Sequence, residues 1–218
     1  MKLPDRILFV GAHCDDIELF AGGLLSRACR EGCRVGVVVF SDHRGIIDDA
    51  AAEQARGEFA ANMAWLTQTT GTAVHDHSGR MLPACSGSFE SERAHIYSCL
   101  EALRDSYDLV VSHPRTDTNQ DHQQVAAEVA RVFKADCSVL AGEFPNNDLG
   151  EFRANFHIAL EPADVDAKVA MVGRYQSQKF GGRPYFAEAT LRGLAAVRGS
   201  QIRKDAAEAF SVVRLRVD

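Results

Sequence analysis

The chain has no long apolar run, no basic stretch and no closely paired cysteines. No segment approaches the roughly 20 apolar residues of a membrane-spanning helix, so no span is expected. The 30 acidic residues outnumber 24 scattered Lys and Arg, and a net charge of −6 argues against a nucleic-acid binder, which would show a basic face. The cysteines form no C-x-x-C pair and are interpreted as reduced core thiols of a cytoplasmic protein: Cys14, Cys29, Cys33, Cys85, Cys99 and Cys137.

The chain also lacks a linker and an internal repeat. No stretch rich in Pro, Gly and Ser divides the 218 residues, and a hydrophobic content of 46% is enough for one good core. Asp5 interrupts the amino terminus and the apolar run from Ile7 has the character of a strand, so no signal peptide is expected. We therefore predict one domain over residues 1–218.

Strand-like runs alternate with helical stripes such as Ile17, Phe20, Leu24 and Ala28. This alternation predicts a doubly wound (Rossmann-like) α/β domain, with a mostly parallel sheet and helices on both faces. In the order 3-2-1-4-5 the first and fourth strands are neighbours at the reversal point, where ligands bind at the carboxyl ends. The five runs are Ile7–Ala12, Arg34–Phe40, Gly71–His75, Asp108–His113 and Cys137–Ala141.

The first of these strands leads into a motif with metal-binding chemistry, Ala12-His13-Cys14-Asp15-Asp16-Ile17-Glu18. His13 and Asp16 are three apart, so they share a face in a first helical turn and can hold one cation. Asp15 remains free beside them, and a spare carboxylate next to an open metal position can take a proton from water. The alternative is that an aspartate only caps the helix.

A second polar cluster, His113 to His122, follows the fourth strand and precedes a helix predicted from Gln123 to Lys134. The sheet order therefore brings Asp117, Asn119, Asp121 and His122 to the crevice that also receives the first motif. Convergence of the two loops favours a metal site over incidental helix caps.

The converging loops offer His13, Asp16 and His122 as three ligands and leave a position for water, as in catalytic sites. Nitrogen and oxygen ligands without thiolate suit Zn²⁺, and Fe²⁺ or another divalent ion would also fit. We expect Cys14 to point away from the ligand face. Asp121 either orients a site histidine or caps the following helix.

These motifs resemble those of the PIG-L (LmbE-like) family of metal-dependent N-acetylglucosaminyl de-N-acetylases, whose first motif is A-H-P-D-D-E and whose second is H-x-D-H. The counterpart of the second motif here is Asn119-Gln120-Asp121-His122. The resemblance implies that His13, Asp16 and His122 are zinc ligands and that Asp15 is the general base. It extends to weaker stretches near the carboxyl end: Tyr175-Gln176-Ser177-Gln178, Arg198-Gly199 and Ala207-Glu208-Ala209-Phe210.

Two departures from the family pattern bear on mechanism. Cys14 replaces the proline and Ile17 is inserted before Glu18, but neither is an implied ligand. Asn119 stands where many relatives have a histidine, and an amide donates a hydrogen bond but does not titrate. We expect Asn119 and Asp121 to assist Asp15 in catalysis, with Asn119 holding the oxyanion. His43 and His113 are candidate substitutes for the missing histidine.

Other polar residues are weaker candidates. Arg44 follows the second strand and either binds a substrate hydroxyl or phosphate or belongs to an exposed turn. Asp117 and His113 join it as expected substrate contacts. His75-Asp76-His77 is interpreted as a turn and not a second metal site, and Phe180-Gly181-Gly182-Arg183 as a loop without a phosphate cradle.

We therefore expect a Zn²⁺-dependent hydrolase that removes the acetyl group from an N-acetylated amino sugar of the GlcNAc type, or from its conjugate. One alternative is a hydrolase of another small amide on the same centre, and another is a non-catalytic sugar- or nucleotide-binding domain. Asp15 argues against the second, because a binding domain has no use for a spare carboxylate, and Gly11-Ala12-His13 is not a G-x-G-x-x-G loop. The expected partner is a small molecule, and a homo-oligomer is compatible with the sequence.

Overall fold

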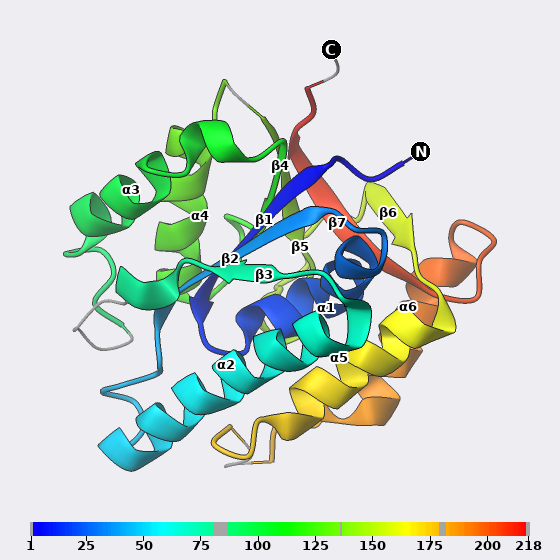
Figure 1. The fold of residues 1–218 in the computed structure, drawn as a ribbon, viewed down its shortest axis with the longest axis horizontal. Coiled ribbons are helices and arrows are strands. Elements are labelled where there is room, and N and C mark those ends of the chain that lie inside the picture. The colour runs from blue at the N-terminus through cyan, green and yellow to red at the C-terminus, as the bar shows by residue number, and fades with distance from the viewer. Residues whose placement is uncertain (1, 81–86, 136, 179–181, 217–218) are drawn as a thin grey trace.

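The computed structural model describes residues 2–80, 87–135, 137–178 and 182–216 and forms one seven-stranded sheet in the order β3-β2-β1-β4-β5-β7-β6 (Figure 1). β1 to β5 pair in parallel, and β7 runs antiparallel to both β5 and β6. The predicted doubly wound α/β fold and the reversal between β1 and β4 are thereby confirmed. Cys85 and residues 180–181 of the glycine loop lie outside the described residues.

The strands have bounds close to those predicted, and two more were not predicted. They are β1 Arg6–His13, β2 Arg34–Ser41, β3 Val74–Asp76, β4 Leu109–Ser112, β5 Ser138–Gly142, β6 Phe156–Ala159 and β7 Ala207–Arg214. The α-helices are α1 Asp16–Arg30, α2 Asp49–Thr70, α3 Arg93–Glu101, α4 Gln120–Val132, α5 Pro162–Arg174 and α6 Glu188–Ser200. The helix that was predicted to begin at Gln123 begins three residues earlier, at Gln120, because Asn119 caps it.

Both faces of β1 are buried, which explains its continuous apolar sequence. Ile7 and Phe9 point into the core formed with α1, α2 and α5, whereas Leu8 and Val10 point into the core formed with α3 and α4. Figure 1 shows the two helix groups on opposite sides of the sheet. The layers leave the carboxyl ends of β1 and β4 free to carry the polar loops.

A kink at Ala21 divides α1, where φ is −147° and ψ is 22°, outside the helical range. Glu208 of β7 accepts hydrogen bonds from the backbone N–H groups of Gly23 and Leu24 at 2.9 and 2.7 Å, and Lys168 donates to the same carboxylate. A carboxylate at this position satisfies N–H groups that the interrupted helix leaves unpaired. This contact gives the Ala207–Phe210 stretch a structural role.

The Tyr175–Gln178 stretch joins α5 to the helices that flank the site. The Tyr175 hydroxyl donates to Glu18 at 2.7 Å, and Asn62 donates to the same oxygen at 3.0 Å. Ser177 Oγ donates to Glu58 Oε2 at 2.6 Å. The two buried bonds to Glu18 hold the first turn of α1, and with it the motif, against α2 and the end of α5.

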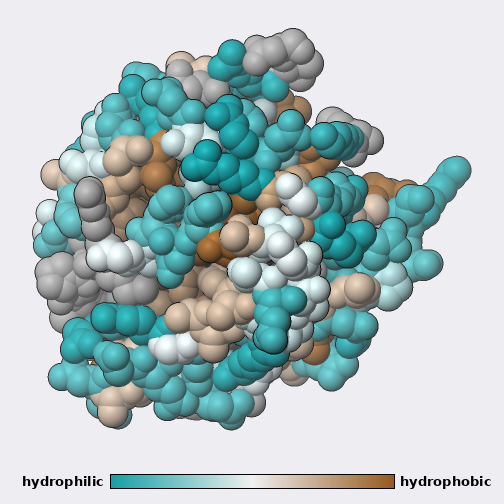
Figure 2. Space-filling view, in the orientation of Figure 1, coloured by the Kyte–Doolittle hydropathy of each residue, from teal (hydrophilic) through white to brown (hydrophobic). Residues whose placement is uncertain are grey.

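No helix in the described part of the chain combines the length and the apolar character needed to cross a bilayer. Figure 2 shows a largely hydrophilic face, with more hydrophobic residues gathered near its middle.

Candidate metal centre

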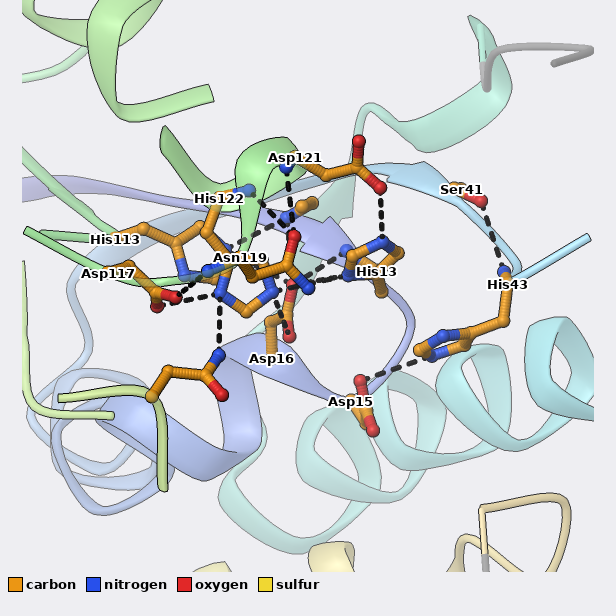
Figure 3. A network of polar contacts seen from close by, with 12 residues as sticks. His13, Asp15, Asp16, Ser41, His43, His113, Asp117, Asn119, Asp121 and His122 are labelled. Atoms are coloured by element: carbon orange, nitrogen blue, oxygen red, sulfur yellow. Dashed lines mark hydrogen bonds and ion pairs between the residues drawn. The ribbon is translucent and has the colours of Figure 1, made fainter. Parts of the chain in front are cut away.

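Two strand-to-helix loops build the candidate centre. β1 ends at His13 and α1 begins at Asp16, whereas β4 ends at Ser112 and α4 begins at Gln120. Because β1 and β4 are parallel neighbours, both loops leave the same edge of the sheet. Figure 3 shows His13 and Asp16 facing His122 across this edge.

Three donor groups converge on one point. His13 Nδ1 lies 3.3 Å from His122 Nε2 and 3.4 Å from Asp16 Oδ2, and His122 Nε2 lies 3.4 Å from Asp16 Oδ1. A tetrahedral Zn²⁺ with bonds of about 2.05 Å separates its ligand atoms by about 3.3–3.4 Å. The three side chains are buried and match this spacing, so the donor set fits a divalent cation.

Two further carboxylates fix the orientation of the histidines. Asp121 Oδ2 lies 3.2 Å from His13 Nε2, and Asp117 Oδ2 lies 2.8 Å from His122 Nδ1. Each carboxylate accepts the proton of the ring nitrogen that faces it, so the other nitrogen presents its lone pair to the centre. Both inward-facing nitrogens can therefore coordinate the same ion.

The charges of the centre also favour a cation. Burial alone would lower the pKa of His13, but the charge of Asp16 and the bond to Asp121 raise it to about 9. Burial is likewise outweighed at His122, where Asp16 and Asp117 raise the pKa to about 10. Protons are strongly attracted to this cluster of carboxylates, and a divalent cation would compete for the same nitrogen lone pairs.

Asp15 lies beside the three donors without joining them. Its Oδ1 is 3.3 Å from His43 Nε2, and its Oδ2 is 3.8 Å from Arg183 Nη1. The side chain is buried but lines the cavity in front of the centre. Asp15 is therefore placed to exchange a proton with a group in that cavity.

Asn119 is the N-cap of α4. Its Oδ1 accepts from the backbone N–H of Asp121 at 2.9 Å and, at 3.5 Å, of His122. The carbonyl oxygen is thus engaged with the helix, and the amide nitrogen is the end of the side chain that remains to face the cavity, which Asn119 also lines. A helix cap and a hydrogen-bond donor are compatible in one residue here.

The family model for GlcNAc-PI de-N-acetylase (PIG-L) matches residues 8–133, more than half of the chain, and spans both loops of the centre. The chain belongs to the PIG-L family. The curated 1D-myo-inositol 2-acetamido-2-deoxy-alpha-D-glucopyranoside deacetylase of Kineococcus radiotolerans is 31% identical to this PIG-L chain over 143 residues. That match covers 60% of the chain but only 36% of the curated relative.

Solved structures share the fold of this PIG-L chain at low identity. A conserved protein from Thermus thermophilus has a TM-score of 0.73 at 20% identity, with 99% of this chain and 97% of that chain covered. The N,N'-diacetylchitobiose deacetylase of Pyrococcus horikoshii has a TM-score of 0.71 at 15% identity, with 96% and 84% covered. The zinc-inhibited form of teicoplanin deacetylase Orf2 has a TM-score of 0.73 at 18% identity, with 98% and 100% covered.

Three predicted substrate contacts of this PIG-L chain have other partners in the structure. Asp117 is buried against His122, so it orients a histidine. His113 is buried behind His122, with ring centroids 3.9 Å apart, and its Nε2 lies 3.1 Å from Asp16 Oδ2. Arg44 pairs with two aspartates outside the cavity lining. None of the three is among the residues that line the cavity.

The two alternatives for Asp121 can also be compared in the structure. Its side chain bonds His13 and accepts from the backbone N–H of Gly87, whereas the side-chain cap of α4 is Asn119. Asp121 therefore matches the orienting role and not the capping role. We keep it as a supporting residue of the centre, and it is not among the residues that line the cavity.

The structure adds residues that the sequence interpretation missed. The cavity, of about 130 Å³, is bounded by the loops after β2 and β5 and by the segment after α5. Arg183 and Tyr185 come from that last segment, where only a loop was expected. Their nearest signal in the sequence was the preceding Tyr175–Gln178 stretch, because Gln178 accepts a hydrogen bond from Arg183 at 3.0 Å. The cavity also receives Leu19, Ile46, Phe144, Asn146 and Asn147.

Other expectations agree with the placement of the residues concerned. Cys14 is buried in the core away from the donors, and the five described cysteines are free thiols. His77 bonds the hydroxyl of Tyr107 at 2.7 Å.

Proposed function

We propose that this chain is a Zn²⁺-dependent hydrolase that removes the acetyl group from an N-acetylated amino sugar of the GlcNAc type, or from its conjugate. Membership of the PIG-L family and the names of the curated and structural relatives support this reaction class. The observation that carries the proposal is the position of Asp15, a buried carboxylate that lines the cavity beside three convergent donors. Fe²⁺ or another divalent ion fits the same donor set.

His13, Asp16 and His122 would hold the ion, and when bound it would polarise an amide carbonyl and make a nearby water molecule more acidic. Asp117 and Asp121 keep the two rings oriented, so the donors need no rearrangement when the ion arrives. Asp16 is itself fixed by the backbone N–H groups of Ala12 and His13 at 2.9 and 2.7 Å.

Asp15 takes a proton from the attacking water and passes it to the leaving amine, since Asn119 cannot titrate. The Asn119 amide donates to the oxygen that becomes negatively charged as the carbonyl carbon turns tetrahedral. Arg183 and Tyr185 line the cavity and offer hydrogen-bonding groups to the hydroxyl groups of a sugar, and Leu19 and Phe144 supply an apolar surface. These residues replace Arg44 as our candidates for substrate contacts.

The experiment is a metal-controlled activity panel. The protein is stripped with a chelator, reloaded with Zn²⁺ or Fe²⁺, and incubated with N-acetylated amino sugars and simple N-acetyl amines while free amine is detected. We expect turnover of the sugars only with metal. Equal turnover of the simple amides would favour the broader amidase, and no turnover of any substrate by the metal-loaded protein would refute a hydrolase of this class.

A further inference from the structure

One histidine faces the cavity without belonging to the proposed ligand set. His43 lies in the loop after β2 and lines the cavity with Asp15. The other candidate for the missing histidine, His113, is sealed behind His122. Of these two candidates, His43 is therefore the one placed to act in the cavity.

His43 is held between two residues of the centre. Its Nε2 lies 3.3 Å from Asp15 Oδ1, and its ring stacks on that of His13 with centroids 4.7 Å apart and planes 15° apart (Figure 3). Only 8% of the residue is exposed. Stacking restricts the plane of the ring, and Asp15 is the aspartate that lies within hydrogen-bond distance of its Nε2 atom.

The backbone of His43 adopts a conformation that is rare outside glycine, with φ at 66°. Two sets of bonds hold it there: its N–H donates to Ser41 Oγ at 3.1 Å, and its carbonyl accepts from Ile46 and Ile47. Such conformations persist where the surroundings determine them, and they concentrate at functional sites. The loop thus holds a strained conformation that brings the ring to Asp15.

We propose that His43 is a positioning residue for the base Asp15, an inference that rests on the proposed function. The Nε2–H group of His43 donates to Asp15 Oδ1 and leaves Oδ2 directed at the cavity. Oδ2 is then the oxygen that accepts the proton of water, and His43 keeps its own proton throughout. The role needs only a donor at Nε2, which both the neutral Nε2–H tautomer and the protonated ring provide.

The test compares His43→Gly, which suits the backbone and removes the ring, with His43→Gln, whose amide nitrogen reaches about as far along the side chain as Nε2 and can donate in its place. Arg203→Gly is the matched control, because Arg203 has a φ of 59° on an exposed turn. The variants are loaded with Zn²⁺ and assayed on the acetylated amino sugar that the parent hydrolyses fastest, with kcat, KM and bound zinc measured.

His43→Gly should lower kcat by about ten- to a hundredfold, as loss of an orienting partner does in metal sites, with KM and zinc content unchanged. His43→Gln should recover part of this loss, and Arg203→Gly should match the parent. In an Asp15→Asn background, His43→Gly should lower kcat no further. An unchanged kcat in His43→Gly, a loss of zinc, or an undiminished effect in the Asp15→Asn background would each overturn the proposal.

A second measurement does not depend on activity. Urea unfolding of the metal-free parent, Asp15→Asn, His43→Gly and the double variant measures the coupling between the two side chains. We expect the Asp15→Asn shift in urea midpoint to differ between the two His43 backgrounds, and additive shifts would overturn the contact. If the parent hydrolyses no substrate, the proposed function fails while this cycle still decides whether His43 holds Asp15.

Discussion

Asp117 offers the sharpest test of how the centre is held together. Its Oδ2 accepts from His122 Nδ1 at 2.8 Å, and its Oδ1 accepts from the backbone N–H of Asn119 at 2.8 Å. Asp117→Asn keeps the shape but leaves one acceptor, because the second oxygen becomes an NH₂ donor. The new amide side chain would therefore turn its NH₂ group either toward His122 Nδ1 or toward the backbone N–H of Asn119, although both of these groups are donors.

The expected loss follows from these two bonds. Removal of an orienting partner costs about 10- to 100-fold in metal affinity, or about 1.4–2.7 kcal/mol. We place Asp117→Asn at the upper end, since its bond to His122 is short and charged. Asp121→Asn should cost less, because the bond from Asp121 to His13 is 3.2 Å and the same carboxylate is anchored by Gly87 N–H.

The assay is a competition for Zn²⁺ between each protein and a chromogenic chelator at fixed pH. Asp108→Asn is the matched control. Asp108 lies just before β4, whereas Asp117 lies in the loop after it, and Asp108 pairs with Arg6 away from the centre. Parent-like affinity in Asp117→Asn, or an equal loss in Asp108→Asn, would refute the orienting role.

Three further predictions address catalysis and packing. Asp15→Asn should lower turnover by roughly two to four orders of magnitude and keep the metal, and metal loss on elemental analysis would make Asp15 a ligand. Asn119→Ala should lose about 2–3 kcal/mol of transition-state stabilisation and about 1 kcal/mol of folding stability. Asn119→Asp keeps the helix cap and should lose only turnover. Kinetics report the role of Asn119 as a hydrogen-bond donor, and urea unfolding reports its role as a helix cap. Gly36→Ala would place a Cβ 2.1 Å from the Tyr107 hydroxyl, so it should destabilise the fold by about 1–3 kcal/mol in thermal unfolding, and an unchanged Tm would contradict the packing.

The sequence was sufficient to predict the central sheet because each strand is short, apolar and followed by a helical stripe. The position of β7 between β5 and β6 was not predictable in this way. Its sequence includes the charged Glu208, whose burial is explained only by Lys168 and the interrupted helix α1. Lys168 lies 40 residues from Glu208 in the sequence, so no local pattern predicts that the two side chains pair.

The candidate centre was likewise predictable from the sequence only in part. His13, Asp15 and Asp16 are close in sequence and follow a recognisable strand, so spacing alone places them together. Arg183 reaches the cavity from a segment beyond α5, and nothing in its local sequence distinguishes it from a surface arginine. Arg44 had the better position in sequence, directly after β2, yet aspartates on its own loop and on α2 engage its guanidinium.

The loops of the centre fold by the same contacts that prepare it for a metal. Asp16 binds the N–H groups at the end of β1, and Asn119 caps the helix that carries His122. Asp117 joins the start of that helix to the His122 ring. A variant that loosens one of these bonds should therefore disturb metal affinity and local helix formation together. Because the donors come from loops more than 100 residues apart, a metal that binds only the folded chain must also stabilise it, by an amount that grows with free metal concentration.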